Sequence, residues 1–396
     1  MDAEKRVLIL NGSLSEIPLI EEAHKLGYYV ITSGNSPKLI GHQYADEYVK
    51  ADYSNKDEIL KLVKEHNVSR IISCANDFGT ITASYVAEKM GWPGHDSYEA
   101  ELILHQKDLM KKMFYENGIR TPRSMPFTDE NEAIEYARTA DYPLIIKATD
   151  LTGGKGINKA ENFEEARKAI SIAFNASRVK HIVVEDFIVG HQESFVGFIV
   201  NQKVACGMNC NCYSPINPYL IQSEVMPGDY YEALKDELTA IMEKICRLLN
   251  LADGVFTLQY LVKDGVPYII ELMKRCLGNQ FLTPVSAVTG FPWHEGLVRA
   301  EMGLDCTCLK AEKPFAKNAG HHGIMCRRNG TIKRVFIPED IQAHVFKQYE
   351  LLKPGEKLEN HLNERVGYIY YSYDDRKELI DAVEHFNERI VVEFED

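Results

Sequence analysis

Short apolar runs alternate with amphipathic segments along the first quarter of the chain. The strand-like runs are Arg6–Leu10, Tyr28–Ser33, Glu47–Lys50 and Arg70–Cys74. Glu16–Leu26 and Lys56–His66 lie between them and repeat apolar residues at helical spacing. Strands that alternate with helices of about 10–15 residues are typical of a parallel, doubly wound α/β sheet. We therefore expect such a sheet at the N-terminus.

The middle of the chain mixes strands and helices in a different order. The pattern predicts helices at Lys107–Glu116, Phe163–Ala173 and Tyr231–Leu249. The strand-like segments are Tyr142–Ala148, His181–Glu185, Ser194–Val200, Lys203–Met208, Gly254–Val262 and Val266–Leu272. The last two flank the turn residues Lys263–Gly265, which predicts a β-hairpin. Residues 317–396 have the pattern of a smaller α+β unit.

Composition narrows the function classes. A chain of 396 residues suits several subdomains around a shared site, and its formal net charge of −13 argues against a nucleic-acid surface. The N-terminal apolar run is too short for a signal peptide, and no run reaches the length of a membrane span. Nine scattered cysteines indicate reduced thiols. We expect a cytoplasmic protein without nucleic-acid or membrane partners.

The segment Lys147–Gly156, KATDLTGGKG, combines a strand, a lysine and a glycine-rich turn. Glycines let backbone N–H groups converge on phosphate oxygens, while lysine supplies positive charge. The segment is not a Walker A loop, because G-x-x-x-x-G-K-[ST] is absent. Alone, it would equally suit a tight hairpin with exposed lysines.

Two further segments carry acidic and amide side chains at strand positions. Val183–Glu193, VVEDFIVGHQE, offers backbone groups for an adenine edge and a carboxylate for ribose hydroxyls, although a solvated strand end would look similar. In the predicted hairpin, Gln259 and Glu271 fall side by side on one face, where their oxygens could hold Mg²⁺ against phosphates. Arg275 follows, either to steady an anionic substrate or to pair with a surface acid such as Glu301.

In this order, the segments resemble the ATP-grasp superfamily. The resemblance implies a Rossmann-like pre-ATP-grasp domain, an ATP-grasp fold in two subdomains and an α+β appendage, over residues 1–106, 107–185, 186–316 and 317–396. It implies ATP and Mg²⁺, with Mn²⁺ as an alternative ion. The implied nucleotide-binding residues are Lys107, Lys147, the lid residues Thr152, Gly153, Gly154, Lys155 and Gly156, the hinge residues Glu185, Asp186, Phe187 and Ile188, the ribose ligand Glu193, and Leu261 against adenine. The implied metal ligands are Gln259 and Glu271, and the implied catalytic residues are Arg275 and Lys147.

One position departs from the family pattern. The family commonly reads E-x-N-P-R where this chain reads Glu271-Leu272-Met273-Lys274-Arg275, and the missing Asn is a metal ligand there. A thioether does not bind a hard cation well. The metal is then held more sparsely, or a neighbour such as Asn279 compensates, or the protein is a non-catalytic ATP-binding regulator.

Within the superfamily, the resemblance favours single-module carboxylate–amine ligases, including amino-acid ligases. Biotin carboxylase and phosphoribosylaminoimidazole carboxylase motifs are missing, and carbamoyl phosphate synthetase large chains carry two such modules, although their metal pair is similar. The implied substrates are a small carboxylate and an amine, and a homodimer is possible. A nucleotide-dependent oxidoreductase is the rival class, but the turn NGSLSE lacks its G-x-G-x-x-G fingerprint.

Several other polar residues invite a functional reading. Asn76-Asp77 follows a strand, where α/β domains place ligands, and is a candidate substrate contact. Asn209, Asn211 and Asn217 could line an acceptor pocket from a loop. Cysteines 206, 210 and 212 have metal-like spacing without a second cluster, so we interpret them as plain thiols. We interpret His321-His322 as a polar strand edge.

Overall fold

The N-terminal sheet is parallel, with the strand order β3-β2-β1-β4. The computed structural model describes residues 5–151 and 156–395. The strands are β1 (Arg6–Leu10), β2 (Tyr29–Gly34), β3 (Glu47–Lys50) and β4 (Arg70–Ile72), and the helices are α1 (Ile17–Lys25), α2 (Lys56–Glu65), α3 (Asp77–Met90) and α4 (Tyr98–His105). The central strands are apolar because helices cover both faces of the sheet. The predicted doubly wound sheet is confirmed.

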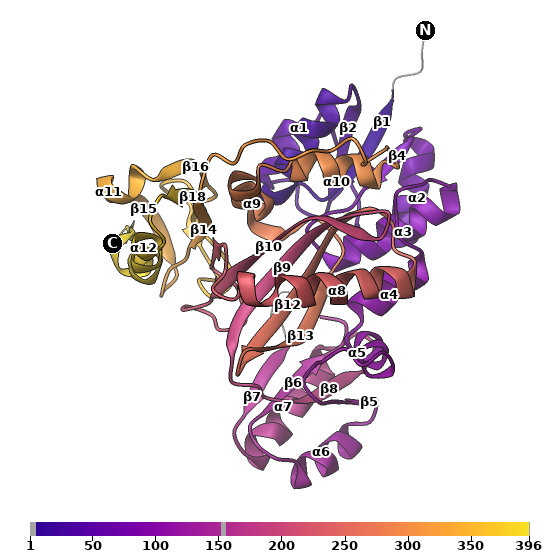
Figure 1. The fold of residues 1–396 in the computed structure, drawn as a ribbon, viewed down its shortest axis with the longest axis vertical. Helices are drawn as coiled ribbons and strands as arrows, with labels where there is room; N and C mark the ends of the chain where they lie inside the picture. Colours follow the sequence, from indigo (N-terminus) through magenta and orange to yellow (C-terminus); the bar gives the residue numbers. More distant parts are fainter. Residues whose placement is uncertain (1–4, 152–155, 396) are drawn as a thin grey trace.

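A small antiparallel sheet lies at the other end of the molecule (Figure 1). Its order is β5-β8-β6-β7, with β5 (Ser124–Phe127), β6 (Leu144–Ala148), β7 (Ile157–Ala160) and β8 (Ile182–Asp186). Helix α5 (Lys107–Glu116) leads into this part, and α6 (Glu130–Thr139) and α7 (Phe163–Ala176) pack on the sheet. Alanines line the inner faces of α6 and α7, so the two helices can approach the sheet closely.

The third sheet has eight strands in the order β13-β12-β9-β10-β11-β14-β18-β16. Its first five strands in chain order are β9 (His191–Val200), β10 (Lys203–Tyr213), β11 (Ser223–Met226), β12 (Gly254–Lys263) and β13 (Val266–Met273). Helix α8 (Tyr231–Leu249) packs on β9, β10 and β12. Helices α9 (Leu282–Thr289) and α10 (Trp293–Glu301) pack on the sheet too, and α10 also contacts α1 and β4. One apolar core therefore joins the N-terminal sheet to the large sheet.

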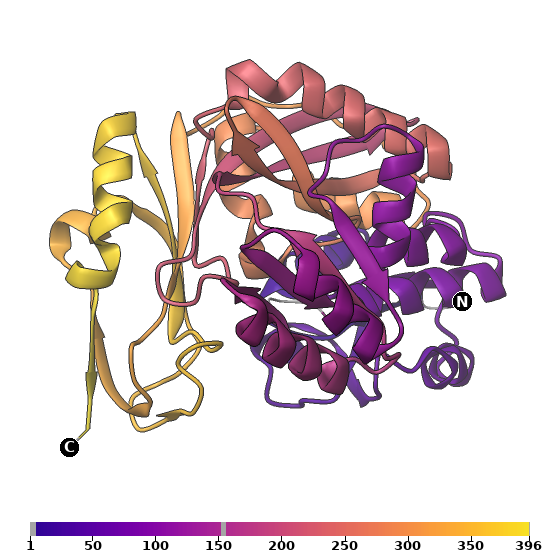
Figure 2. The same cartoon turned by 90° about the horizontal axis from the view of Figure 1, so that it is seen from below.

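The C-terminal part extends the large sheet and adds a smaller one. β14 (Asn318–Ile324), β16 (Val345–Glu350) and β18 (Gly367–Tyr373) belong to the large sheet, while β15 (Gly330–Phe336), β17 (Lys357–Leu358) and β19 (Val391–Phe394) form a separate sheet. The helices of this part are α11 (Glu339–Gln342) and α12 (Arg376–Arg389). In Figures 1 and 2, this part stands to one side of the other sheets.

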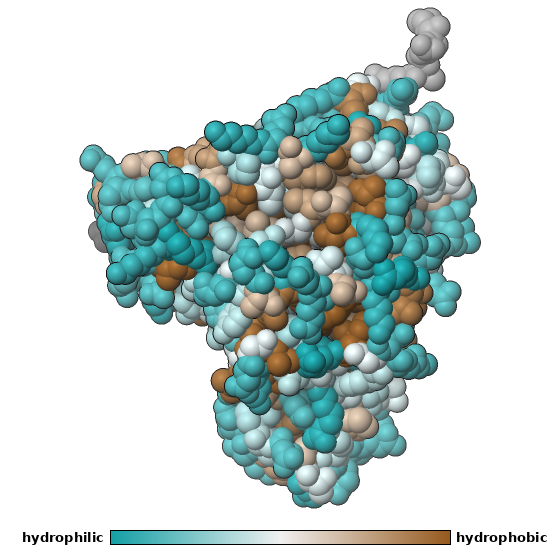
Figure 3. Space-filling view, in the orientation of Figure 1, coloured by the Kyte–Doolittle hydropathy of each residue, from teal (hydrophilic) through white to brown (hydrophobic). Residues whose placement is uncertain are grey.

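One face of the molecule is shown in Figure 3, and it is largely polar. On the face in Figure 3, hydrophilic residues cover the outer parts, and apolar residues gather toward the centre of the molecule. Among the described residues, no helix combines the length and apolar character needed to cross a bilayer.

Candidate active site

A cavity of about 760 Å³ opens between the small sheet and the large sheet. Residues 75–77, which follow β4 of the N-terminal sheet, also line it. Ten of the residues that the resemblance implies for nucleotide binding, metal binding or catalysis face this one cavity. They are Lys107, Lys147, Glu185, Asp186, Phe187, Ile188, Gln259, Leu261, Glu271 and Arg275. Lid residues 152–155 lie outside the described residues, and Gly156, with a φ of +70°, precedes β7.

Two lysines and a glutamate form a buried charge cluster on the small-sheet side. Lys147 of β6 and Lys111 of α5 both pair with the Glu185 carboxylate of β8, and the Lys111–Glu185 distance is 3.0 Å. Burial alone raises the pKa of Glu185, but the two ammonium groups outweigh burial and lower that pKa to about 2. The carboxylate of Glu185 is therefore committed to the lysines, and any adenine contact at this position falls to the backbone.

Lys111 was not singled out in the sequence. It lies four residues after Lys107 in α5, so both side chains project from one helical face. Burial lowers the pKa of Lys111 to about 8, in spite of the nearby Glu185 carboxylate. Lys107 donates to the Leu151 carbonyl at 2.7 Å. The i, i+4 spacing was the available signal for this second lysine.

The aromatic ring of the hinge segment after β8 lies beside a cation of β7. The Lys159 ammonium of β7 lies 4.1 Å from the centre of the Phe187 ring, and both residues line the cavity. Leu261 of β12 faces them from the large sheet. The neighbouring Ile145 and Ile157 are apolar as well, so this end of the cavity suits a flat heteroaromatic ring.

Gln259 of β12 and Glu271 of β13 are paired directly across the hairpin, as predicted. Both line the cavity, while Tyr260, the next residue of β12, is fully buried on the opposite face. Within the described part, neither side chain makes a hydrogen bond or ion pair with protein. Two adjacent oxygen ligands fit a hard divalent cation such as Mg²⁺.

Met273 lines the same wall two residues beyond Glu271. Asn279 also reaches the cavity, but its side-chain oxygen accepts a hydrogen bond from the Tyr368 hydroxyl at 2.5 Å. The idea that Asn279 replaces the missing asparagine ligand therefore gains no support from its contacts.

Arg275 is buried and held by the N-terminal domain. Its Nε donates to Asp77 Oδ1 at 2.5 Å, and its Nη1 donates to the Cys276 carbonyl at 3.0 Å. Among the described residues, Nη2 has no hydrogen-bond partner. The alternative pairing with Glu301 is wrong, because that carboxylate instead accepts hydrogen bonds from the Ser73 backbone and hydroxyl. Arg275 also lines the cavity.

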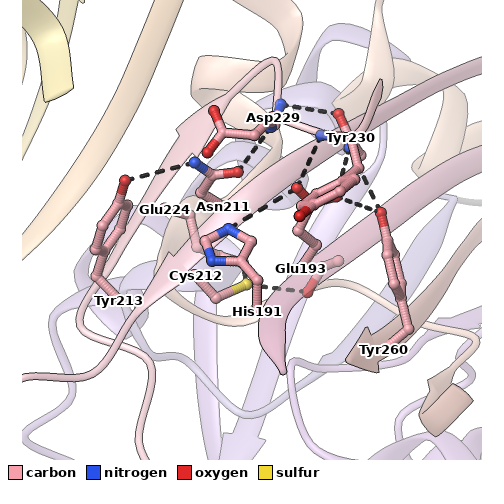
Figure 4. Close-up of polar contacts among 12 residues, drawn as sticks. His191, Glu193, Asn211, Cys212, Tyr213, Glu224, Asp229, Tyr230 and Tyr260 are labelled. Atoms are coloured by element: carbon pink, nitrogen blue, oxygen red, sulfur yellow. Dashed lines mark hydrogen bonds and ion pairs between the residues drawn. The ribbon is translucent and has the colours of Figure 1, made fainter. Parts of the chain in front are cut away.

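The structure contradicts the position of Glu193 in the predicted nucleotide site. Glu193 is 0% exposed and faces away from the cavity, where it accepts hydrogen bonds from Asn209 at 2.7 Å and from Tyr260 at 2.6 Å. Figure 4 shows it beside Tyr230 and Tyr260. Since side chains alternate along β9, the two neighbours Gln192 and Ser194 line the cavity instead.

The asparagine cluster has a structural role. Asn209 and Asn211 lie in β10 rather than in a loop, and both are fully buried. They accept hydrogen bonds from the backbone N–H groups of Gly228 and Asp229, each at 2.8 Å, which fixes the turn before α8. Asn217 lies in a loop but donates to the Leu362 carbonyl at 3.0 Å. The prediction that Asn209 and Asn211 line an acceptor pocket is wrong.

His321 and His322 lie in the interior rather than at a sheet edge. Their strand, β14, runs between β11 and β18, and both side chains are almost fully buried. His321 Nε2 lies 2.8 Å from a Glu224 oxygen, and His322 Nδ1 lies 2.7 Å from the Ser223 hydroxyl. The interpretation as a polar strand edge is therefore wrong.

The sequence and the structure of this chain are similar to those of known proteins. Residues 105–216 match the family described as phosphoribosylglycinamide synthetase, ATP-grasp (A) domain. The carbamoyl phosphate synthase large chain of Campylobacter jejuni is 22% identical over 287 residues, which are 68% of this chain and 26% of that protein. This chain thus spans about a quarter of the length of that relative.

Two solved structures match along nearly the whole chain. The L-amino acid ligase of Bacillus licheniformis has a TM-score of 0.82 at 17% identity, with 100% of both chains covered. The phosphoribosylglycinamide synthetase of Anaerococcus prevotii has a TM-score of 0.78 at 21% identity and covers 99% of this chain and 100% of its own. These two structures share the fold of this chain, an α/β and α+β architecture, and residues 105–216 match the ATP-grasp domain model.

Proposed function

We propose that this ATP-grasp protein is an ADP-forming carboxylate–amine ligase. The observation that carries the proposal is the convergence of Lys147, Arg275 and the Gln259–Glu271 pair on one cavity. Phosphate-binding charge, a guanidinium edge and two free oxygen ligands are what phosphoryl transfer to a carboxylate needs. We also propose that the chain is divided into four domains, with boundaries after residues 106, 185 and 316.

The nucleotide would lie between the two sheets. Its base would fit among Ile145, Phe187 and Leu261, with the backbone of the hinge as hydrogen-bonding partner. Gln192 is the polar side chain that alternation places toward a ribose. Lys107 and Lys147 would bind the phosphates, since their ammonium groups face the same cavity.

The metal pair fits a magnesium ion, because both side chains offer hard oxygen donors and make no competing protein contact in the described part. Bound there, Mg²⁺ would neutralise phosphate charge during transfer. Glu271 and Gln259 would hold it together with phosphate oxygens and water, a sparser set than one that includes an asparagine.

The reaction would run in two steps. A substrate carboxylate oxygen attacks the γ-phosphorus, the bond to the bridging β–γ oxygen breaks, and ADP leaves. An amine nitrogen then attacks the acyl carbon, inorganic phosphate leaves, and the nitrogen loses a proton. Arg275 would bind the carboxylate and the transferred group with its free edge, and Lys147 would offset the growing phosphate charge. Excluding water from the cavity protects the acyl phosphate.

The similarity to an L-amino acid ligase and to a phosphoribosylglycinamide synthetase supports an amide product. Both substrates are to be identified by phosphate release with Mg²⁺, ATP and paired pools of carboxylates and amines. We expect release that requires both pools, and hydroxylamine should trap the activated acid as a hydroxamate. Nucleotide binding without phosphate release for any pair of carboxylate and amine pools would instead indicate a regulator. The variant Lys147→Ala supplies the background rate of phosphate release.

A further inference from the structure

Two cysteines, a glutamate and a histidine gather beside the ligase cavity, and the proposed reaction uses none of them. Cys210 and Cys212 lie on one face of β10, Glu224 lies in the adjacent β11, and His321 lies in β14. We propose that Cys210, Cys212 and Glu224 form a binding site for a thiophilic divalent ion of the zinc class. The proposal stands apart from the ligase activity, since none of these residues is assigned to ATP or magnesium.

The donor atoms already have the spacing of a metal site. The two sulfur atoms and a Glu224 oxygen all lie within 4.8 Å of one another. Glu224 Oε1 is 3.4 Å from the sulfur of Cys210 and 3.6 Å from that of Cys212. A tetrahedral ion with Zn–S of about 2.3 Å and Zn–O of about 2.0 Å places sulfur and oxygen ligands about 3.5 Å apart. Binding would therefore need little movement of the sheet.

The charge around Glu224 favours a cation. The carboxylate is 7% exposed, and no described lysine or arginine lies within ion-pair distance of it. Its second oxygen, Oε2, contacts His321 Nε2 at 2.8 Å, which leaves Oε1 toward the thiols. Carboxylates that bind a metal are themselves hydrogen-bonded by outer groups, and His321 is such a group for Glu224. On binding, each thiol releases its proton to solvent as a metal–sulfur bond forms.

The donor set selects the ion. Thiolates are soft ligands that prefer zinc-class ions, whereas Mg²⁺ prefers oxygen donors such as those of Gln259 and Glu271. The site also touches the cavity wall, because Ser194 and Glu224 line the cavity and Ser194 Oγ is 3.4 Å from Cys212 Sγ. Three protein ligands leave the fourth position of a tetrahedral ion to the serine hydroxyl or to a ligand from the cavity.

The test uses Co²⁺ as a spectroscopic probe on the full chain, reduced and freed of metal, without ATP. We expect one Co²⁺ per chain, with a thiolate-to-cobalt charge-transfer band and the intense visible bands of tetrahedral cobalt, displaced by Zn²⁺. The double variant Cys210→Ser/Cys212→Ser should lose both, and His321→Gln should bind about 10- to 100-fold more weakly. Cys206→Ser, on the same strand but outside the cluster, should match the wild type.

A second measurement covers variants that fold poorly. In the wild type, Zn²⁺ should protect two thiols from a thiol reagent, and excess chelator should expose them again. Absence of a saturable cobalt spectrum in the wild type, or an unchanged spectrum in a folded double variant, would overturn the proposal. Neither the cobalt spectrum nor the thiol protection depends on ligase activity. The metal-site proposal and the ligase proposal can therefore fail independently of each other.

Discussion

Asp77 and Arg275 form a buried ion pair between residues 198 positions apart in the chain. Asp77 opens α3 of the N-terminal domain, and Arg275 follows the end of β13 in the large sheet. His105 Nδ1 lies 3.4 Å from the same Asp77 oxygen that Arg275 contacts. Although burial raises the pKa of Asp77, Arg275 and His105 outweigh it and lower that pKa. The N-terminal domain thus fixes the direction of the proposed catalytic arginine.

We predict that Arg275→Lys binds ATP within about threefold of the wild type but loses turnover by about 100-fold or more. Nucleotide contacts fall to the lysines and the hinge, whereas lysine cannot reproduce a planar guanidinium held at Nε with a free edge. ATP affinity and carboxylate-dependent ADP release, measured side by side, decide the matter. Arg299→Lys, a helix-surface control, should behave as wild type, and full turnover by Arg275→Lys would refute the role.

Lys147→Ala and Glu271→Ala should each abolish ADP formation without unfolding the protein. Each removes charge stabilisation of several kcal/mol, about 3 or more, from the proposed phosphoryl-transfer site. The two should differ in one respect: rising Mg²⁺ concentration should partly restore only Glu271→Ala. Circular dichroism checks the fold, and normal ADP formation by either variant contradicts the assignment.

Local patterns predicted the elements that carry this site. Helix α5 and helix α8 begin and end where the apolar spacing places them, at Lys107–Glu116 and Tyr231–Leu249. The pairing of Gln259 with Glu271 followed from a short turn and the geometry of a hairpin, because such a turn leaves little freedom in the register. Short-range patterns therefore predicted that the two residues of the proposed metal pair lie side by side.

Contacts between segments that lie far apart in the chain could not be predicted from the sequence. No local pattern reports that Asp77 meets Arg275, or that Lys111 reaches a glutamate on β8. The face of the sheet to which a side chain is assigned depends on the exact register of its strand, since a shift of one residue exchanges the two faces. The predicted strand began at Ser194, whereas β9 begins at His191, so the alternation was not applied to Glu193.

The low pKa of Glu185 predicts an acid-sensitive stability. Its folded value, about 2, lies below the ordinary value of 4.5, so the pair stabilises the protein above about pH 4.5 and this contribution is lost as the pH falls toward about 2. Glu185→Gln should be destabilised by about 3 kcal/mol at neutral pH, because two buried cations lose their counter-charge.

Denaturant unfolding at several pH values checks this. Between about pH 5 and about pH 3, the wild type should lose more stability than the variant. Glu237→Gln, which removes an exposed pair with Arg120, should change stability by no more than about 0.5 kcal/mol. Equal acid sensitivity of the wild type and Glu185→Gln would show that the two lysines do not depress this pKa.

Gln192 and Glu193 are adjacent in β9 but face opposite sides of the large sheet, which gives a matched pair of variants. Gln192→Ala should raise the KM for ATP about tenfold and leave stability nearly unchanged, because it removes a polar contact from the cavity wall. Glu193→Gln should instead lower the stability of the protein and leave the KM for ATP nearly unchanged. Its carboxylate accepts hydrogen bonds from Asn209, Tyr260 and the Tyr230 backbone, and a neutral amide weakens those contacts by about 1–3 kcal/mol. Thermal unfolding and ATP kinetics on both variants separate the roles. A large rise in KM for Glu193→Gln at unchanged stability would return the ribose contact to that residue.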